Sequence, residues 1–470
     1  MKSCLKLCLI LSVVCPVLSR GEESLEIGSR RELFVDRYLI AEMRGAELKL
    51  NPLSPAAPSS QPALAGHYAT VLRDGDTFRQ YCRGDKIAGL HWRTDGWETY
   101  HAAELTLLAE SLDGIVWRKP DLGRYEIERY PHGNVVLADK FLVNHNFTPM
   151  IDTKPGVDTR QRYKAIGGGS YRQHGATLRL KYGDGGLYAF CSPDGVHWDR
   201  LRDEPIIPEN WGSFDSQNVA FYSPAEAQYV CYFRTFEKGF RTVSRSTSRD
   251  FMTWTEPMMM RGRMEKEHLY TSGVHPYFRA PHIYIAPATW YLPGENPNTR
   301  VVLLTSRAGS DAFDRTFGRE EFLPNAAAGN RTNYIAWTNG VRTGLRELSF
   351  YSLGTRFTLR LDGFGSLHAD GSDGQAITRP FTFSGDRLTL NYSARVGGSV
   401  RVEICDLDDE PIEGFSLEQC VPLVGDEIDG RVRWKSGAEL GDLAGRAVSL
   451  RFVVRLADVF AMQFSDENED

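Results

Sequence analysis

Two carboxylate residues of this 470-residue chain stand directly before runs that resemble β-strands. Asp215 precedes Ser-Gln-Asn-Val-Ala-Phe-Tyr, and Glu267 precedes His-Leu-Tyr-Thr. A pair of carboxyl groups, one protonated and the other ionised, can supply the general acid and the base or nucleophile of a hydrolysis. The sequence therefore offers Asp215 and Glu267 as a catalytic pair. Their structural alternatives are a cap at a strand start for Asp215 and a solvated charge run for Glu267.

Hydrogen-bonding side chains recur at the starts of the other expected first strands. Such groups bind sugar hydroxyls, and the substrate-binding candidates are His145, Gln217, Asn218, His275 and Arg279. Further candidates at these positions are His67, Tyr68, Asn146, Tyr277, Arg331 and Asn333. The histidines have the alternative of being satisfied core residues. Arg279 has two readings, a contact to the carboxylate or sulfate of an acidic sugar and an ion pair with an Asp of the fold.

Metal-ligating residues show no short local spacing that would indicate a metal site. We therefore predict no metal and no cofactor. A meeting of His145, His275 and Asp215 in one place, or a structural calcium ion, stays open as an alternative.

A turn motif, Ser-x-Asp-(Gly/Phe)-x-x-Trp, indicates how these residues are positioned. It occurs at Ser111–Trp117, Ser192–Trp198 and Ser248–Trp254, with an altered copy at Ser306–Phe313. The Asp carboxylate can accept backbone N–H bonds, the Gly permits unusual dihedral angles, and the Trp packs on the sheet below. Repetition after a β-like run predicts a repeated β architecture.

The repeated unit occurs five times, each time beginning with a strand and a hairpin. The expected first strands are His67–Arg73, Asn144–Asp152, Asp215–Ser223, Tyr270–Arg279 and Arg331–Trp337. This predicts an all-β chain: a five-bladed β-propeller over residues 20–355 and, from the alternating strands that follow, an antiparallel β-sandwich over residues 356–470. The first strands of a propeller line its central funnel, so their polar residues converge there. Asp36 and Glu110 are weaker candidates with structural alternatives.

Charge and the first residues limit the partners and the compartment. The formal net charge of −6 argues against binding to nucleic acid. Basic Lys2 and Lys6 precede an apolar run over Leu7–Val17, which predicts an export signal over residues 1–19 and a secreted or periplasmic protein without membrane insertion. Five cysteines follow the signal. Either Cys405 pairs with Cys420, or all five are small buried hydrophobic residues.

Several segments together resemble a known family. They are Glu32–Ile40, Ala109–Gly123, Phe214–Pro224, Glu267–Ile285, Leu303–Gly309 and Leu361–Leu367. The chain resembles secreted bacterial proteins related to the N-terminal domain of glycosyl hydrolase family 32, in the superfamily of families 32 and 43. The resemblance implies a propeller, a sandwich and glycoside hydrolase activity on a polysaccharide or oligosaccharide. The family 32 strings Asn-Asp-Pro-Asn-Gly, Arg-Asp-Pro and Glu-Cys do not occur in the chain. The alternatives are a carbohydrate-binding propeller without catalysis and an extracellular interaction scaffold.

Overall fold

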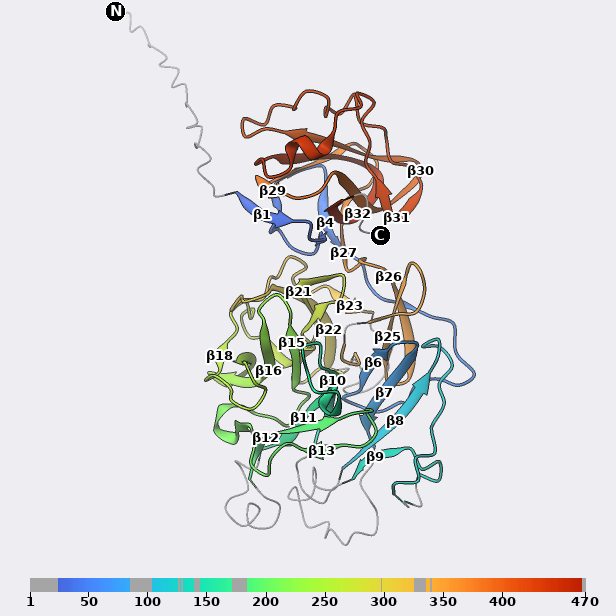
Figure 1. Ribbon diagram of the computed structural model, residues 1–470, viewed down its shortest axis with the longest axis vertical. Helices are drawn as coiled ribbons and strands as arrows, with labels where there is room; N and C mark the ends of the chain where they lie inside the picture. Colours follow the sequence, from blue (N-terminus) through green and yellow to red (C-terminus); the bar gives the residue numbers. More distant parts are fainter. Residues whose placement is uncertain are drawn as a thin grey trace, which may run out of the picture.

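The computed structural model describes residues 24–84, 104–125, 127, 130–138, 144–170, 184–296, 298–324, 335–338 and 340–466. In these ranges the regular structure is almost entirely β-strand, interrupted by 3-10 turns at Thr159–Gln161, Glu209–Trp211 and Leu440–Leu443. Figure 1 shows small sheets arranged around a common centre, with a second, smaller β domain stacked above them, and the strand pairing gives five such sheets. The predicted export signal lies outside the described residues.

The five sheets are antiparallel blades of a propeller, as the sequence predicts. Blade 1 contains β6 (Thr70–Asp74), β7 (Thr77–Arg83), β8 (Leu105–Ser111) and β9 (Val135–Ala138). Blade 2 contains β10 (Thr148–Ile151), β11 (Tyr163–Gly169), β12 (Gly186–Ser192), β13 (Asp199–Arg200) and β14 (Ile207–Pro208). Blade 3 contains β15 (Val219–Ser223), β16 (Gln228–Glu237), β17 (Phe240–Ser248) and β18 (Met258–Met259). Blade 4 contains β19 (His268–Thr271), β20 (His275–Tyr277), β21 (Ala280–Tyr291), β22 (Thr299–Arg307) and β23 (Glu321–Leu323). Blade 5 contains β24 (Val341–Arg342), β25 (Glu347–Ser352), β26 (Thr355–Arg360) and β5 (Ser54–Pro55).

Blade 5 closes the ring by joining distant parts of the chain. Its outer strand β5 comes from the N-terminal region and pairs antiparallel with β26, with Pro55 opposite Phe357. A parallel bridge between Thr70 and Trp337 links blade 1 to blade 5. Closure of this kind leaves fewer unpaired strand edges around the ring.

The second domain is the predicted β-sandwich, antiparallel except for the parallel pair β1 and β29, and it takes strands from both ends of the chain. Its C-terminal strands are β27 (Gly365–Ala369), β28 (Gly374–Thr378), β29 (Phe381–Phe383), β30 (Arg387–Cys405), β31 (Asp426–Arg431) and β32 (Ser449–Ser465). Its N-terminal strands are β1 (Leu25–Gly28), β2 (Glu32–Leu33), β3 (Ile40–Arg44) and β4 (Glu47–Leu50). In Figure 1 the blue strands β1 and β4 lie among these orange and red strands.

This topology differs from the expected boundaries, which placed residues 20–355 in the propeller. Strand β3 pairs with β28, β4 with β27, and β2 with β32. Ile27 and Leu39 are buried in the core of the sandwich. The physical reason is the hydrophobic effect, because residues of this N-terminal region such as Ile27 and Leu39 remove their apolar surface from water by packing against C-terminal strands.

The repeated Ser-Asp turns have the predicted hydrogen bonds in all three copies. In the second copy Ser192 Oγ accepts from Gly195 N at 2.8 Å, and Asp194 Oδ1 accepts from the N–H groups of Val196 and His197, each at 2.8 Å. The carboxylates of the other two copies, Asp113 and Asp250, accept the corresponding pairs of N–H bonds. The glycine position has a left-handed backbone throughout. Its residues are Gly114 (φ 71°), Gly195 (φ 76°) and Phe251 (φ 69°).

A second repeat joins neighbouring blades and has no simple sequence signature. A tyrosine near the start of the second strand of one blade donates its hydroxyl to a carboxylate at the end of the first strand of the preceding blade. The pairs are Tyr163 with Asp74, Tyr229 with Asp152 at 2.7 Å, and Tyr284 with Glu226 at 2.6 Å. Lys164 and Arg245 add ion pairs to Asp152 and Glu226 respectively. These contacts fix the angle between blades because both partners are buried or nearly so.

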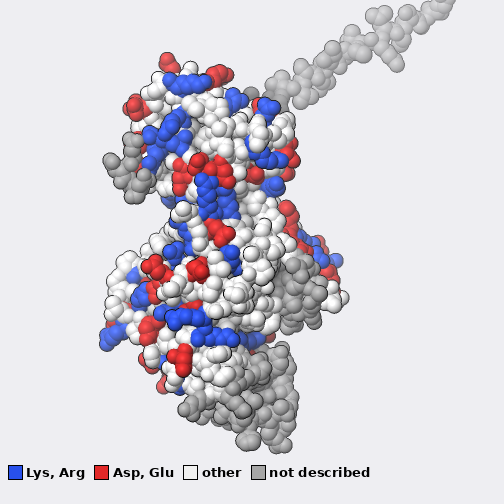
Figure 2. Space-filling model, turned by 90° about the vertical axis from the view of Figure 1, so that its right-hand side faces the viewer, with Lys and Arg blue, Asp and Glu red and all other residues white. Residues whose placement is uncertain are grey.

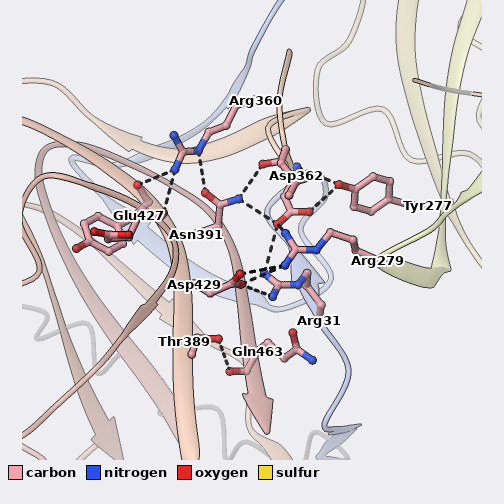
Figure 3. Close-up of polar contacts among 12 residues, drawn as sticks. Arg31, Tyr277, Arg279, Arg360, Asp362, Thr389, Asn391, Glu427, Asp429 and Gln463 are labelled. Carbon is pink, nitrogen blue, oxygen red and sulfur yellow. Dashed lines mark hydrogen bonds and ion pairs between the residues drawn. The ribbon is translucent and has the colours of Figure 1, made fainter. Parts of the chain in front are cut away.

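The junction between the two domains combines apolar packing with charge pairs. Figure 2 shows Lys or Arg and Asp or Glu side chains gathered at the waist between the domains. At its centre Asp362 is fully buried and accepts from Tyr277 Oη and Arg279 Nη1, each at 2.7 Å (Figure 3). Arg31 contacts Asp362 at 3.3 Å and also contacts Asp429. Around this network an apolar cluster joins the propeller to Leu33, Val35, Phe364 and Ala461.

The five cysteines in the described part of the chain are all unpaired, which decides between the two alternatives for Cys405 and Cys420. Four of the five are buried, and Cys191 keeps some exposure. Within the described ranges, no helix is long and apolar enough to cross a membrane.

Candidate functional site

The candidate site lies at the end of the propeller where the first strand of each blade begins, which we call the entry end. Antiparallel register brings the end of each second strand to the same level. Thr70 pairs with Tyr81, which places Tyr68 level with Arg83. Val219 pairs with Tyr232, so the residues before β15 lie near Arg234.

On the side of blades 1 and 2, Arg83, Glu104, His145 and Asn146 form a closed ring of hydrogen bonds. Arg83 Nη1 donates to Glu104 Oε1 and to Asn146 Oδ1, each at 3.2 Å. Asn146 Nδ2 contacts His145 Nε2 at 2.9 Å, and His145 Nδ1 contacts Glu104 Oε2 at 2.8 Å. An amide nitrogen can only donate, so Nε2 of His145 accepts and Nδ1 carries the proton that is donated to Glu104. The ring therefore holds one tautomer of His145.

Backbone conformation at this end is unusual for two equivalent residues. Tyr68 and Asn146 each stand two residues before a first strand, and their φ angles are 51° and 49°. Left-handed backbone is uncommon for non-glycine residues and is found at sites where the surroundings force it. Both residues contact Arg83, whose guanidinium lies 4.8 Å from the centroid of the Tyr68 ring and donates to Asn146 Oδ1.

On the side of blades 3 and 4, Asp215 contacts the guanidinium of Arg234. The Asp215 side chain is 33% exposed, whereas that of Arg234 is 3% exposed. Arg234 Nη2 also donates to Ser213 Oγ at 3.3 Å, and the guanidinium lies 5.0 Å from the Tyr270 ring. A partly exposed carboxylate thus stands in front of a buried positive charge.

A second guanidinium, that of Arg241, completes this side. It lies 4.8 Å from the ring of Tyr291 and 5.5 Å from the rings of Tyr270 and Phe236. Phe236 is the direct cross-strand partner of Arg241 and is 49% exposed. The result is a shelf of alternating cations and aromatic rings, of the kind stabilised by cation–π attraction. We call Arg234, Phe236, Arg241, Tyr270 and Tyr291 the cation–aromatic shelf.

Blades 1 and 3 meet at this end, because Gln217 Nε2 of blade 3 donates to Tyr68 O at 3.4 Å and to Ala69 O at 3.0 Å. Burial, the largest influence, and the neighbouring charge of Arg241 lower the pKa of Arg234. The phenols of Tyr270 and Tyr68 act in the opposite direction. Tyr68 of blade 1 therefore lies within electrostatic reach of Arg234 of blade 3.

Several predicted binding residues are buried and engaged by the fold. His145 is fully buried in the ring described above. Gln217 crosses from blade 3 to blade 1, where its Nε2 donates to Ala69 O at 3.0 Å. Asn218 donates Nδ2 to Ser216 O at 3.0 Å. These contacts show that His145, Gln217 Nε2 and Asn218 Nδ2 have partners within the fold, and sugar contacts by these residues stay a prediction.

His275 has a mixed environment. It packs edge-on against Trp337, with ring centroids 5.2 Å apart, and keeps intermediate exposure. Burial lowers the pKa of His275 to about 4, so the imidazole is neutral at physiological pH. A neutral imidazole can exchange hydrogen bonds with a hydroxyl group but offers no charge.

Two further predicted site residues also have partners within the fold. Glu267 is fully buried, bonded to Arg315 Nη2 at 2.9 Å and to Met264 N at 3.1 Å. Glu267 thus lies in a buried ion pair, and its role as the partner of Asp215 in a catalytic pair stays a prediction. Arg279 lies in the hairpin at the other end of its blade, bound to Asp362 and Asp429 at the domain junction (Figure 3). It is the alternative reading of Arg279, the ion pair, that the structure shows.

The weaker candidates have structural partners. Asp36 pairs with Arg307, and Glu110 pairs with Arg79 and Arg118. Arg331 and Asn333 lie outside the described residues. Within the described ranges, no group of three or more His, Cys, Asp or Glu residues is arranged to hold a metal ion.

Sequence reasoning missed Arg83, Glu104, Arg234 and Arg241. All four stand at or near strand ends in runs of ordinary β composition, and Arg241 is the second residue of β17. A usable signal was present, because an arginine inside a strand run rarely stays buried without a partner or a function.

Comparisons with known proteins concern the architecture. No family model matches the chain, and no curated protein matches it. Its neighbours among solved structures include glycoside hydrolases of families 43 and 32. An exo-β-1,3-galactanase from Phanerochaete chrysosporium is 11% identical with a TM-score of 0.40, covering 89% of this chain and 99% of that chain. A family 32 β-fructofuranosidase from Bombyx mori is 8% identical with a TM-score of 0.37, covering 89% and 94%. A β-1,2-mannobiose phosphorylase from Listeria innocua is 10% identical with a TM-score of 0.39, covering 66% and 95%.

Proposed function

We propose that the protein is a glycoside hydrolase that binds a polysaccharide or oligosaccharide at the entry end of the propeller. The observation that carries the proposal is Asp215. Among the predicted site residues it alone joins a carboxylate, accessible surface and a place at this end. In this proposal Asp215 is the residue that touches the reacting bond.

The surroundings of Asp215 suit a carboxylate that works in its ionised form. The charge of Arg234 offsets that of Asp215, and the buried guanidinium fixes its position. An ionised carboxylate serves as the base that activates water or as the nucleophile that attacks the anomeric carbon. The exposed face of Phe236 offers an apolar surface for a sugar ring.

Binding without cleavage is the second candidate, and a specific observation favours it. Glu267 is buried in an ion pair, and Glu104 has both oxygens engaged by Arg83 and His145. Hydrolysis needs a second carboxyl group that can donate a proton. A lectin-like propeller has no such requirement.

The purified protein assayed against a panel of polysaccharides separates these candidates. Asp215→Asn keeps the size of the side chain and removes its charge. Asp311→Asn is the matched control, because Asp311 is also a partly exposed carboxylate paired with an arginine, Arg261. We expect the wild type and the control to release reducing ends, and Asp215→Asn to release at least about a hundredfold less.

Binding of a saccharide by the wild type without any release supports the second candidate. Unchanged release by a folded Asp215→Asn variant removes Asp215 from the reaction. Melting curves of both variants establish that they are folded.

We also propose that the chain is exported, on the basis of Lys2, Lys6 and the apolar run that follows them. N-terminal sequencing of the protein made by its natural host tests this. A mature chain that begins near Arg20 supports export, and one that keeps residues 1–19 contradicts it.

A further inference from the structure

We propose that the entry end selects saccharides with an anionic substituent, a carboxylate or a sulfate ester, which binds to the guanidinium groups of Arg234 and Arg241. This inference rests on the proposed function, because it names the class of sugar for the same site.

The first argument is the balance of charge. Arg234 and Arg241 both lie against the ring of Tyr270, and their guanidinium carbons are 5.0 and 5.5 Å from its centroid. Of the two, only Arg234 has a carboxylate partner in the described part of the chain, which is Asp215. Two cations and one anion leave one positive charge at the shelf.

The second argument is the set of donors that the fold leaves unused. Nε and Nη1 of Arg234, and Nε of Arg241, are buried and have no hydrogen-bond partner among the described residues. A buried donor without a partner costs about 1–3 kcal/mol, more when it is charged. An incoming anion would satisfy such donors, and the planar fork of a guanidinium matches the oxygens of a carboxylate or sulfate.

The third argument is the exposed ring next to these donors. Phe236 is nearly half exposed, and the guanidinium groups of Arg234 and Arg241 lie 5.7 and 5.5 Å from its ring centroid. A sugar ring stacked on Phe236 would place a substituent within reach of both cations. Burial lowers the pKa of Arg234, and the like charge of Arg241 lowers it further.

The groove at the domain junction makes an instructive contrast. It has a volume of about 480 Å³ and is lined in part by Arg346 and Arg360. Both of these arginines are already paired, with Asp426 and with backbone oxygens of the sandwich. The shelf therefore offers unused positive charge, and the groove does not.

The test measures binding by calorimetry to matched pairs of oligosaccharides that differ only in charge. One pair is an oligogalacturonate and its carboxyl-reduced form, and the other is a sulfated galactan oligomer and its desulfated form. We expect at least one acidic member to bind about tenfold or more tightly than its neutral partner, an advantage that shrinks as salt rises. Comparison of the two pairs decides between carboxylate and sulfate.

Variants assign the discrimination to the shelf. Arg241→Gln should abolish most of the preference for the acidic member. Arg261→Gln, at a surface arginine, should leave it unchanged. Arg234→Lys keeps the charge but loses the fork, so it should reduce the preference while the protein still folds.

Three outcomes overturn the inference. If the neutral members bind or are cleaved as well as the acidic members, the proposed function stands and the inference falls. A preference that persists in folded Arg241→Gln also overturns it. If no member of either pair binds, both the inference and the saccharide site fail.

Discussion

Asp215 and Arg234 form an ion pair whose two members differ sharply in their exposure to water. The arginine is buried, and the aspartate keeps a third of its side-chain surface. Removing Asp215 should lower the free energy of unfolding more than removing Arg234 does, because it leaves a buried charge uncompensated, whereas removing Arg234 leaves a partly exposed one. Asp215 thus compensates the buried charge of Arg234 and is also the residue that we propose to act on the substrate.

For this pair we expect Asp215→Ala to lower the free energy of unfolding by about 2–3 kcal/mol, and Arg234→Met by less. The double variant should be more stable than Asp215→Ala alone. Urea denaturation of the single and double variants measures the difference. A larger loss of stability for Arg234→Met than for Asp215→Ala would contradict the conclusion that Arg234 is the buried member of the pair.

His275 should make stability depend on pH. Burial lowers its pKa to about 4, whereas the unfolded imidazole titrates near 6.5. Between these values the unfolded chain binds more protons, so stability is full above about pH 6.5 and falls as the pH drops toward 4. The expected loss between pH 7 and pH 5 is about 2 kcal/mol.

Denaturation of the wild type and of His275→Gln at both pH values isolates this contribution. The variant should lose about 2 kcal/mol less than the wild type over the same interval. Equal losses would show that other groups, among them His67 and His268, whose pKa values are also lowered, account for the dependence.

The Ser-Asp turns supply a comparison between two glycines. Gly195 has a left-handed backbone, and a methyl group there would lie 2.6 Å from Tyr81 Oη. Gly75 has a similar φ of 58° but open space around it. We expect Gly195→Ala to cost about 3 kcal/mol and Gly75→Ala about 1 kcal/mol, since only the first adds overpacking to the backbone strain. Thermal melting of the two variants gives the comparison, and equal losses would mean that Tyr81 moves away freely.

Asp362 at the domain junction should be far more sensitive than its exposed neighbour Asp426. Asp362 is fully buried between Arg31 and Arg279, whereas the side chain of Asp426 is half exposed. Asp362→Asn should cost about 3 kcal/mol or more, and Asp426→Asn about 1 kcal/mol or less. Urea denaturation tests both. A small effect at Asp362 would show that Asp429 compensates the two arginines by itself.

The same junction predicts a loss of stability in acid. Burial by itself raises the pKa of Asp429, but Arg31 and Arg279 outweigh it, and the net pKa is lowered. A carboxylate with a lowered folded pKa stabilises the protein above its unfolded value near 3.9, and this contribution is lost as the pH falls below that value.

Local interactions explain why the fold class could be predicted from the sequence. The Ser-Asp turns bond within seven residues, so Ser192, Asp194 and Trp198 already specify their own geometry. The alternation of apolar residues likewise specifies strands without any distant partner. The five blades and the all-β character follow from such local patterns.

Long-range pairing explains what the sequence could not reveal. Strand β5 completes blade 5 because Phe357 and Pro55 meet across some 300 residues of chain, and β3 joins the sandwich through β28. Glu267 stands in a charge run typical of a solvated loop, yet Arg315 buries it. Arg234 belongs to an ordinary strand run. Its neighbour Arg241 comes from the adjoining strand of the same hairpin, but Tyr270 of blade 4 and Tyr68 of blade 1 reach it only through the closed ring. The sequence by itself determined the turns and strands, whose bonds are local. The tertiary structure decided which charges are buried and which meet at one end, because burial and pairing depend on residues far apart in the chain.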